Sequence, residues 1–278
     1  SFCHKLCNGA NDIDDSYVFA TWFYWSGTLN GQTYTHEHGD INIDLDCTPS
    51  PCDERIRVQP RAFLEGPLDR TAGLMGNGLS SLLPTDEPYS GLGFTHVGPG
   101  GGESFSPIIL LVTGNDAIVD WVFLELRSAL DNTQIIATRS ALLQRDGDIV
   151  DMNGFSSVEF EGVATGDYYL TVRHRNHLGI MSLNTLSLSD TPMTVDFTDG
   201  SVATFGTAAQ NIVAGQAAMV CANVNGDGSI DALDRGELWN NRSTAGYSRH
   251  DATCDGVTDA IDRGAAWNNR SRTEQLPQ

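Results

Sequence analysis

Short apolar runs separated by turn residues dominate the chain between residues 16 and 198. Gly, Asp, Asn and Pro bound these runs, as is typical of β-strands. They cover residues 16–25, 54–66, 106–114, 117–127, 133–144, 156–163, 167–175 and 193–198. In the run 117–127, one face carries Val122, Leu124 and Leu126, and the other carries Trp121 and Phe123. Both faces are apolar, so we predict a central strand that is covered on both sides.

No helical pattern alternates with these runs, which favours an antiparallel β-sandwich over a parallel α/β sheet. The predicted fold class is mainly β, with a sandwich followed by a small α-helical unit. Residues 1–26 are an N-terminal segment that could act as an assembly strand, 27–210 the sandwich and 211–278 the helical unit. A division of the sandwich near 105–117 is an alternative. The glycine-rich stretch 71–102 is predicted to be a long surface excursion.

A pattern of oxygen-bearing residues occurs twice near the end of the chain. Residues 223–234 read NVNGDGSIDALD, and residues 251–262 read DATCDGVTDAID with the same spacing. The following letters match at ten of thirteen positions between DALDRGELWNNRS and DAIDRGAAWNNRS. This duplication predicts two equivalent loop-helix repeats.

The spacing within each repeat predicts a Ca²⁺ loop. Ca²⁺ takes about six to eight oxygen ligands, which a twelve-residue loop offers from positions 1, 3, 5, 7, 9 and 12 around a glycine at position 6. The candidate ligands are Asn223, Asn225, Asp227, the Ser229 carbonyl, Asp231 and Asp234 in loop 1, and Asp251, Thr253, Asp255, the Val257 carbonyl, Asp259 and Asp262 in loop 2. The alternative is a pair of acidic glycine turns that cap two helices. Loop 2 has the greater number of carboxylates and is expected to bind Ca²⁺ more tightly.

The charge of the chain restricts its partners. The formal net charge is -20, from 36 acidic and 16 basic residues, and Lys5 is the only lysine. Such a surface repels phosphate backbones and anionic lipids, so we expect neither nucleic acid nor membrane surfaces as partners. No apolar stretch reaches the roughly 20 residues of a membrane span. No hydrolase or nucleotide-binding motif is present, so the chain is predicted not to be an enzyme.

The six cysteines fall into close or matched sets: Cys3 with Cys7, Cys47 with Cys52, and Cys221 with Cys254. An even number in an acidic, lysine-poor chain predicts disulfides and export, with removal of any signal peptide. Free buried thiols are the alternative. Cys221 lies two residues before loop 1 and Cys254 is position 4 of loop 2, so we predict a disulfide that clamps the paired loops.

The repeat pair resembles the dockerin type I family over about residues 221–270. The resemblance implies that each loop-helix unit binds one Ca²⁺ and that the two units pack with near two-fold symmetry. The positions before the last ligand differ from those of dockerins that bind cohesins, because they are Ala232, Leu233, Ala260 and Ile261. Trp239 and Trp267 occupy matched helical positions, where we expect them to pack against the other repeat or the preceding domain; sugar stacking is the alternative.

Within the predicted sandwich, residues 140–182 (SALLQRDGDIVDMNGFSSVEFEGVATGDYYLTVRHRNHLGIMS) and 193–210 (MTVDFTDGSVATFGTAAQ) resemble the C-terminal region of secreted surface proteins of the Bacteroidota. The stretch GDYYLTVRHR also resembles prealbumin-like modules, and the whole chain resembles protomers of extracellular helical fibrils. These resemblances imply a non-enzymatic secreted structural protein, either a fibril subunit or a surface adhesion module, that self-associates into a homopolymer. We expect the contact to use either an exposed sheet edge or the aromatic segment 17–25, by strand addition. The alternative is a carbohydrate-binding module whose tail docks onto a surface scaffold.

Two histidine pairs need separate interpretation. His174 and His177 would lie on opposite faces of an extended strand, so we predict a structural role in which Arg173 and Arg175 pair with carboxylates. His36 and His38 share one face, but two ligands do not make a metal site. The sequons at Asn241 and Asn269 are interpreted as copies of one repeat, not as glycosylation sites.

Overall fold

A computed structural model describes residues 28–29, 32–33 and 54–277. The chain forms two compact units, residues 1–53 and 54–278. In the first, β1 (Thr28–Leu29) pairs antiparallel with β2 (Gln32–Thr33). The predicted assembly segment 1–26, His36 and His38, and the predicted disulfides Cys3–Cys7 and Cys47–Cys52 lie outside the described residues.

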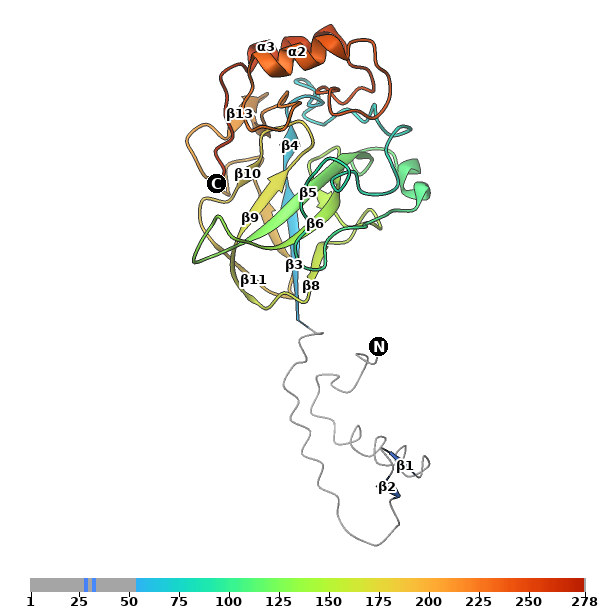
Figure 1. Cartoon of the computed structure of the whole chain (residues 1–278), viewed down its shortest axis with the longest axis vertical. Coiled ribbons are helices and arrows are strands. Elements are labelled where there is room, and N and C mark those ends of the chain that lie inside the picture. The colour runs from blue at the N-terminus through green and yellow to red at the C-terminus, as the bar shows by residue number, and fades with distance from the viewer. Residues whose placement is uncertain (1–27, 30–31, 34–53, 278) are drawn as a thin grey trace. The chain divides into compact units, whose positions relative to one another are not determined.

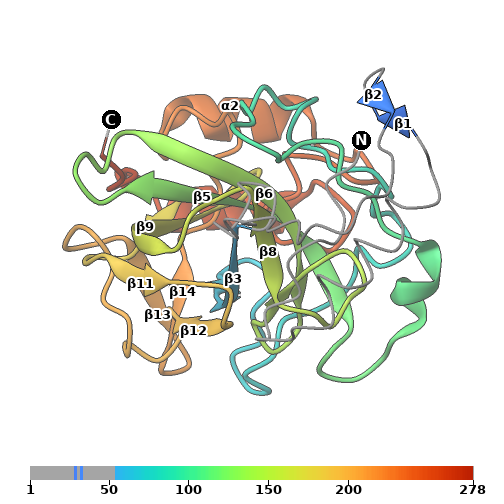
Figure 2. The ribbon, with the colours of Figure 1, turned by 90° about the horizontal axis from the view of Figure 1, so that it is seen from below.

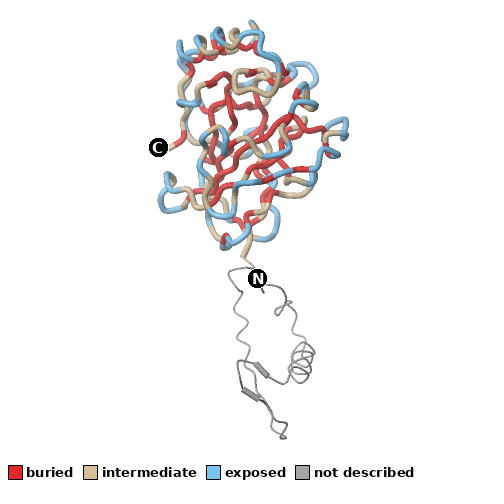
Figure 3. The backbone as a smooth tube through the Cα atoms, turned by 45° about the vertical axis from the view of Figure 1, so that its right-hand side comes forward, coloured by how far each residue is buried: buried red, intermediate tan, exposed pale blue. Residues whose placement is uncertain are grey.

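The largest sheet of the second unit is built around β5, and its strands are neighbours in the order β10-β9-β5-β6-β7 (Figure 1). Their bounds are β5 (Ile118–Ser128), β6 (Ile135–Gln144), β7 (Ile149–Val150), β9 (Gly166–Arg173) and β10 (Ile180–Met181), and β11 (Leu186–Leu188) also pairs with β9. All of β5 except Ser128 is buried, which confirms the predicted central strand. Figure 3 shows buried residues in red through the interior of the second unit, with exposed residues in pale blue around them.

A second, three-stranded sheet has the order β12-β3-β8, formed by β12 (Met193–Asp196), β3 (Arg55–Arg61) and β8 (Val158–Glu161). Its apolar residues share one core with those of the β5 sheet, including Ile56, Phe160 and Val195. The mainly β fold predicted from the sequence is confirmed. Figure 2 shows β3 and β8 from below, near β5 and β6.

The prediction of purely antiparallel pairing was wrong at two places. β3 pairs parallel with β12, and β4 (Phe63–Leu64) pairs parallel with β14 (Gln216–Met219). A parallel pair needs a long crossover connection, and the chain that builds the β5 sheet supplies it here. Pairing partners so far apart in sequence leave no local signal.

A third sheet, β13-β14-β4, includes residues near the predicted boundary at 211. β13 (Gln210–Val213) and β14 form a hairpin whose two connecting residues, Ala214 and Gly215, both have positive φ angles of 53° and 85°. That backbone is the two-residue turn that suits the twist of a hairpin. The predicted boundary therefore falls inside the second compact unit, at a paired strand.

The segment 106–114, predicted as a strand, instead forms the 3₁₀ helix η1 (Pro107–Leu111). Its proline lies in the first turn, where a missing N–H costs nothing, and Ile108 and Leu111 are exposed instead of buried. The stretch 71–102 consists of turns and isolated bridges without a helix or a paired strand, as expected of an excursion, but it is not confined to the surface: Met75, Leu79 and Tyr89 are fully buried in the core.

The α-helices described in residues 54–277 are α2 (Ala232–Asn240) and α3 (Ala260–Asn268), at one end of the unit (Figure 1). Each is only nine residues long, too short to be stable alone. No described helix has the length and apolarity needed to cross a membrane.

Candidate metal centre

Both helices start in the same way, directly after position 9 of their loop. Asp231 caps α2 and Asp259 caps α3, with backbone angles that agree within 3°. Each cap belongs to a capping box in which the N3 carboxylate, from Asp234 or Asp262, accepts the cap's own N–H. The sequence equivalence of the repeats is therefore also a structural equivalence.

Loop 1 folds back on the buried Asp234 carboxylate. Its Oδ1 accepts the N–H groups of Val224 and Asn225 at 2.8 and 3.3 Å, and its Oδ2 accepts that of Asp231 at 2.9 Å. The Asn225 amide donates to the Asp227 carboxylate at 2.9 Å. The structure thus brings together Asn225, Asp227 and Asp234 of the predicted ligand set.

Loop 2 repeats this arrangement around two buried carboxylates. Asp262 Oδ1 accepts the Thr253 N–H at 2.9 Å and its hydroxyl at 3.0 Å. Asp251 accepts the N–H groups of Asp255 and Gly256 at 3.1 and 2.8 Å. Asp251 and Asp262 are both fully buried, so positions 1 and 12 of this loop lie inside the protein.

The chemistry of both loops fits a cation. Burial raises the pKa of Asp234 and Asp262, and it raises the pKa of Asp251 to about 6, which shows that the buried charges lack full compensation. In loop 1, the buried Asn223 Oδ1 has no hydrogen-bond partner. An orphaned buried acceptor at ligand position 1 is the group that a cation would satisfy.

The carboxylates of each loop do not themselves converge as a tight set. Within residues 54–277, the metal-binding side chains that lie within 4.8 Å of one another are Asp120, His174 and Cys254. The loop carboxylates accept backbone N–H groups instead. The sequence did not single out this other cluster, because its three members are far apart along the chain.

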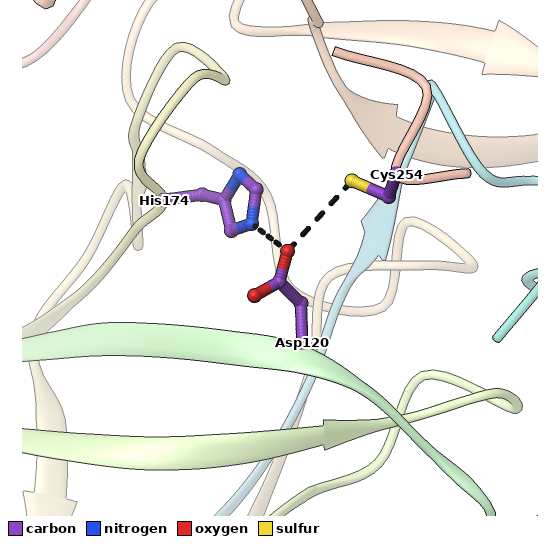
Figure 4. Close-up of side chains that lie close together, drawn as sticks. All are labelled: Asp120, His174 and Cys254. Carbon is purple, nitrogen blue, oxygen red and sulfur yellow. Dashed lines mark hydrogen bonds and ion pairs between the residues drawn. The ribbon is translucent and has the colours of Figure 1, made fainter. Parts of the chain in front are cut away.

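Asp120 is the centre of that cluster, and Figure 4 shows His174 and Cys254 pointing toward it. Its Oδ2 accepts from Arg175 at 2.7 Å and faces His174 Nε2 at 3.1 Å, while its Oδ1 accepts the Tyr247 hydroxyl at 2.9 Å. Burial raises the pKa of Asp120, but Arg175 and His174 outweigh burial and hold this pKa well below its usual range. Asp120 is therefore a buried carboxylate paired with a buried guanidinium.

Arg175 also links Asp120 to loop 2 through hydrogen bonds. Its Nη1 donates to the carbonyl oxygens of Ser248 and Asp251, the latter at 3.2 Å. Its guanidinium also lies over the Tyr247 ring, 4.5 Å from the ring centre. The predicted pairing of Arg175 with a carboxylate is confirmed, and so is that of Arg173, which meets Glu125 at 3.4 Å.

The prediction that His174 and His177 lie on opposite faces was wrong, because β9 ends at Arg173 and the chain then bends. Their Nδ1 atoms are 2.9 Å apart. Gly66 donates its N–H to His177 Nε2 at 3.3 Å, so the His177 proton is on Nδ1. His174 then accepts at Nδ1 and donates from Nε2 to Asp120. This proton order matches neutral rings, and burial lowers the pKa of both histidines.

Asp120, His174 and Cys254 do not have the arrangement of a catalytic triad. A triad places the histidine between the nucleophile and the carboxylate, whereas here Asp120 lies between His174 and Cys254. Burial also raises the pKa of the Cys254 thiol well above its usual value. Asp120 Oδ2, the oxygen that would bind a metal together with His174 and Cys254, already accepts a hydrogen bond from Arg175. The cluster is a structural one.

The predicted Cys221–Cys254 disulfide is contradicted, because both cysteines are free and buried. Each thiol faces a different polar group: Cys254 lies 3.8 Å from Asp120, and Cys221 lies 3.4 Å from Asn269. The Asn269 amide also donates to Glu65 at 2.6 Å, so the side chain of this sequon asparagine is buried and hydrogen-bonded within the protein.

Glycines allow loop 2 to contact the excursion closely. A side chain at Gly66 would overlap the Ala252 carbonyl, and one at Gly78 would come within 3.0 Å of the Asp255 Cα. Leu82 lies against Gly256, the turn glycine of the loop. Loop 2 therefore packs on residues 66–82.

Loop 1 is held by the C-terminal segment. Glu274 donates its N–H to the Gly228 carbonyl at 2.7 Å, and its carboxylate accepts from Gly179 and Arg173 at 2.8 and 3.3 Å. Leu276 is buried beside Gly179. Both loops are thus fixed to the strands by contacts from outside the repeats.

The two tryptophans contact the opposite repeat, as predicted, but they are not core residues. Trp239 is 49% and Trp267 56% exposed. Arg263 of the second repeat lies over Trp239, and Arg235 of the first lies over Trp267.

No family model and no curated protein matches this chain. It is similar to an N-terminal interface mutant of the type II cohesin–X-dockerin complex from Acetivibrio cellulolyticus, at 12% identity and a TM-score of 0.31 over 79% of this chain and 96% of that chain. It is also similar to a C-terminal interface mutant of that complex, at 16% identity and a TM-score of 0.31 over 64% and 94% of the two chains. TM-scores this low support no conclusion about this chain.

Proposed function

We propose that this chain is a non-enzymatic, secreted structural protein, a fibril subunit or surface adhesion module, whose dockerin-like repeat pair is stiffened by two Ca²⁺ ions. The observation that carries the proposal is the pair of equivalent loops, each closed over a buried carboxylate and followed by an identically capped helix. In loop 1, the buried Asn223 Oδ1 has no hydrogen-bond partner, which supports its assignment as a Ca²⁺ ligand.

The residues that would hold Ca²⁺ are those of the two predicted ligand sets. A bound ion would supply positive charge to carboxylates that burial now leaves partly uncompensated. The loops contact both the excursion and the C-terminal segment, so neutralising them stabilises contacts beyond the repeats. The ion has a structural use in this proposal and takes part in no reaction.

Thermal unfolding in Ca²⁺ and in chelator tests the metal part of the proposal. We expect a lower melting temperature in chelator, because ligand binding to the folded state alone stabilises it. Asp255→Asn removes a loop 2 carboxylate, and Ser201→Ala is a control outside both loops. Equal melting temperatures with and without Ca²⁺ would refute the metal site.

Electron microscopy of the full chain tests the structural part. Filaments in Ca²⁺ that are lost or altered in chelator are the expected result. Dispersed monomers in both conditions would contradict the fibril subunit and leave the adhesion module to be tested by surface binding.

A carbohydrate-binding module is the second candidate, favoured by one polar cavity of about 400 Å³ on the outer face of β3 and β8. Arg57, Arg139, Asp151 and Glu159 line it, and the neighbouring Phe155 is 79% exposed. Planar polar groups beside an exposed aromatic ring are suited to sugars. Binding on a glycan array by the monomeric chain, lost in Phe155→Ala, would favour this candidate.

A further inference from the structure

We infer that the outer face of α2 and α3 is a cationic contact surface for the acidic surface of a second copy of this chain. The inference rests on the proposed self-association and names the face that carries it. Four arginines and two tryptophans form this face, here called the Arg-Trp ladder: Arg235, Trp239 and Arg242 on the first repeat, and Arg263, Trp267 and Arg270 on the second.

The ladder is ordered by spacing along the chain and by contacts between the repeats. Within each repeat the three residues follow an i, i+4, i+7 pattern. The first two lie on one face of the helix, and the last, Arg242 or Arg270, follows the helix end and donates to the carbonyl of Trp239 or Trp267. Arg242 lies 4.3 Å from the Trp239 ring centre and Arg263 4.8 Å from it. The Trp267 ring has the equivalent contacts with Arg270 and Arg235, at 4.7 and 5.0 Å. Each indole is thus engaged by two guanidinium groups, which leaves little ring face for sugar stacking.

The arginines of the ladder have no carboxylate partner within the described residues. Other arginines do have such partners. Those that form ion pairs with Asp or Glu side chains are Arg55, Arg57, Arg61, Arg127, Arg139 and Arg173 on strands, and Arg175 in the bend after β9. On the helices, Asp234 and Asp262 are buried in the loops, and Glu237 lies 3.2 Å from His250 and forms no ion pair with an arginine of the described residues. The ladder therefore presents four uncompensated positive charges in a chain that has an excess of acids.

Charge complementarity identifies a second copy as the partner. The chain carries a net charge of -20, so without the four ladder arginines the remainder carries -24. Two ladders cannot face each other, because like charges would then meet across the contact. The ladder must bind a different, acidic part of the next copy. Such a head-to-tail contact generates an open chain of subunits, as a fibril requires.

Charge reversal of the two exposed ladder arginines tests the inference. Arg242→Glu and Arg270→Glu are compared with Arg70→Glu, which reverses an exposed arginine just before the excursion and changes the net charge equally. Assembly of the full chain is measured by sedimentation at fixed Ca²⁺ and ionic strength. We expect the critical concentration to rise about tenfold in each ladder variant, through loss and reversal of exposed ion pairs, and to stay within about twofold in Arg70→Glu.

Three outcomes separate this inference from the proposed function. Ladder variants that assemble like Arg70→Glu would overturn the ladder contact while the fibril subunit stands. A wild-type chain that does not assemble would overturn both. Circular dichroism checks the fold of each variant, and Arg242→Gln, which only removes the charge, replaces a reversal that unfolds. An intermediate loss in Arg242→Gln is expected, and no loss would count against the ladder.

Discussion

Replacing Asp120 by Asn should be among the most destabilising single changes in this protein. Asp120 and Arg175 are both completely buried and lie 2.7 Å apart. The asparagine would leave the Arg175 guanidinium charged in the interior without its counter-ion. Breaking a buried pair in this way costs about 3–5 kcal/mol. For a unit of this size, each kcal/mol lowers the melting temperature by about 2–4 °C, so a decrease of about 10 °C is expected.

Urea unfolding of the full chain measures this cost, with Asp151→Asn as the matched control. Asp151 pairs with Arg139 at 3.1 Å, but the two side chains are 18% and 23% exposed. Solvent screens such a pair, so the control should lose less than about 1 kcal/mol. A second variant, Asp120→Asn with Arg175→Met, removes both charges and should regain part of the stability.

Two results would refute this reasoning. If Asp120→Asn lost no more stability than Asp151→Asn, the buried guanidinium would be compensated by other groups, such as the carbonyl oxygens of loop 2. If the double variant were less stable than Asp120→Asn alone, the hydrogen bonds of Arg175 to those carbonyls would outweigh its pairing with Asp120. Either result would mean that loop 2 is held mainly by the hydrogen bonds of Arg175 to backbone carbonyl oxygens and not by its ion pair with Asp120.

Three further changes test other contacts. Gly66→Ala should cost about 1–3 kcal/mol, because the methyl group would overlap a loop 2 carbonyl; stability equal to the wild type in urea unfolding would contradict this contact. His174 and His177 have lowered pKa values when folded, so stability should be full above about pH 6.5 and fall below it as the unfolded rings take up protons, by up to about 1.4 kcal/mol per pH unit for each ring. His177→Asn should flatten this pH dependence, and an unchanged slope would contradict it. The thiols of Cys221 and Cys254 should react with Ellman's reagent only after unfolding, without a reductant, whereas a peptide pair joined by a disulfide in mass spectrometry would show that they are bonded.

The sequence predicted the parts of the fold that depend on local patterns. The run around Trp121 has large apolar residues on both faces, and it forms the buried central strand. The segment 106–114 looked equally apolar but became a 3₁₀ helix, because its proline and its exposed end outweighed composition. The hairpin at 210–219 was missed, since its small residues hide a strand pattern and Ala214 with Gly215 is not one of the residue pairs that mark a two-residue turn. Parallel pairing of β3 with β12 had no signal, because the partners are far apart in sequence.

In the candidate site, too, the features set by local spacing were predicted and those set by long-range contacts were not. The spacing of the loops located both helix caps and the buried carboxylates at Asp234 and Asp262, because ligand order along twelve residues is a local property. The network around Asp120 could not be predicted, since it joins a strand, a bend and a loop from three parts of the chain. The predicted Cys221–Cys254 disulfide was wrong, because two cysteines that both lie near the loops in the sequence need not have their sulfur atoms in contact; here they face Asn269 and Asp120.

The repeats are held to the strands by three separate sets of contacts. Arg175 connects the Asp120 carboxylate on β5 to carbonyl oxygens of loop 2, and Glu274 connects loop 1 to the end of β9. Glu65, just after β4, accepts from Asn269 at the end of α3. Charged groups make all three connections. Each connection is stronger when water is excluded from it, and the other two help to exclude water by holding the repeats against the strands. A rearrangement of either loop would therefore expose buried charge on the sheets. We therefore expect a change in either loop to alter the stability of the whole second unit and not of the helices alone.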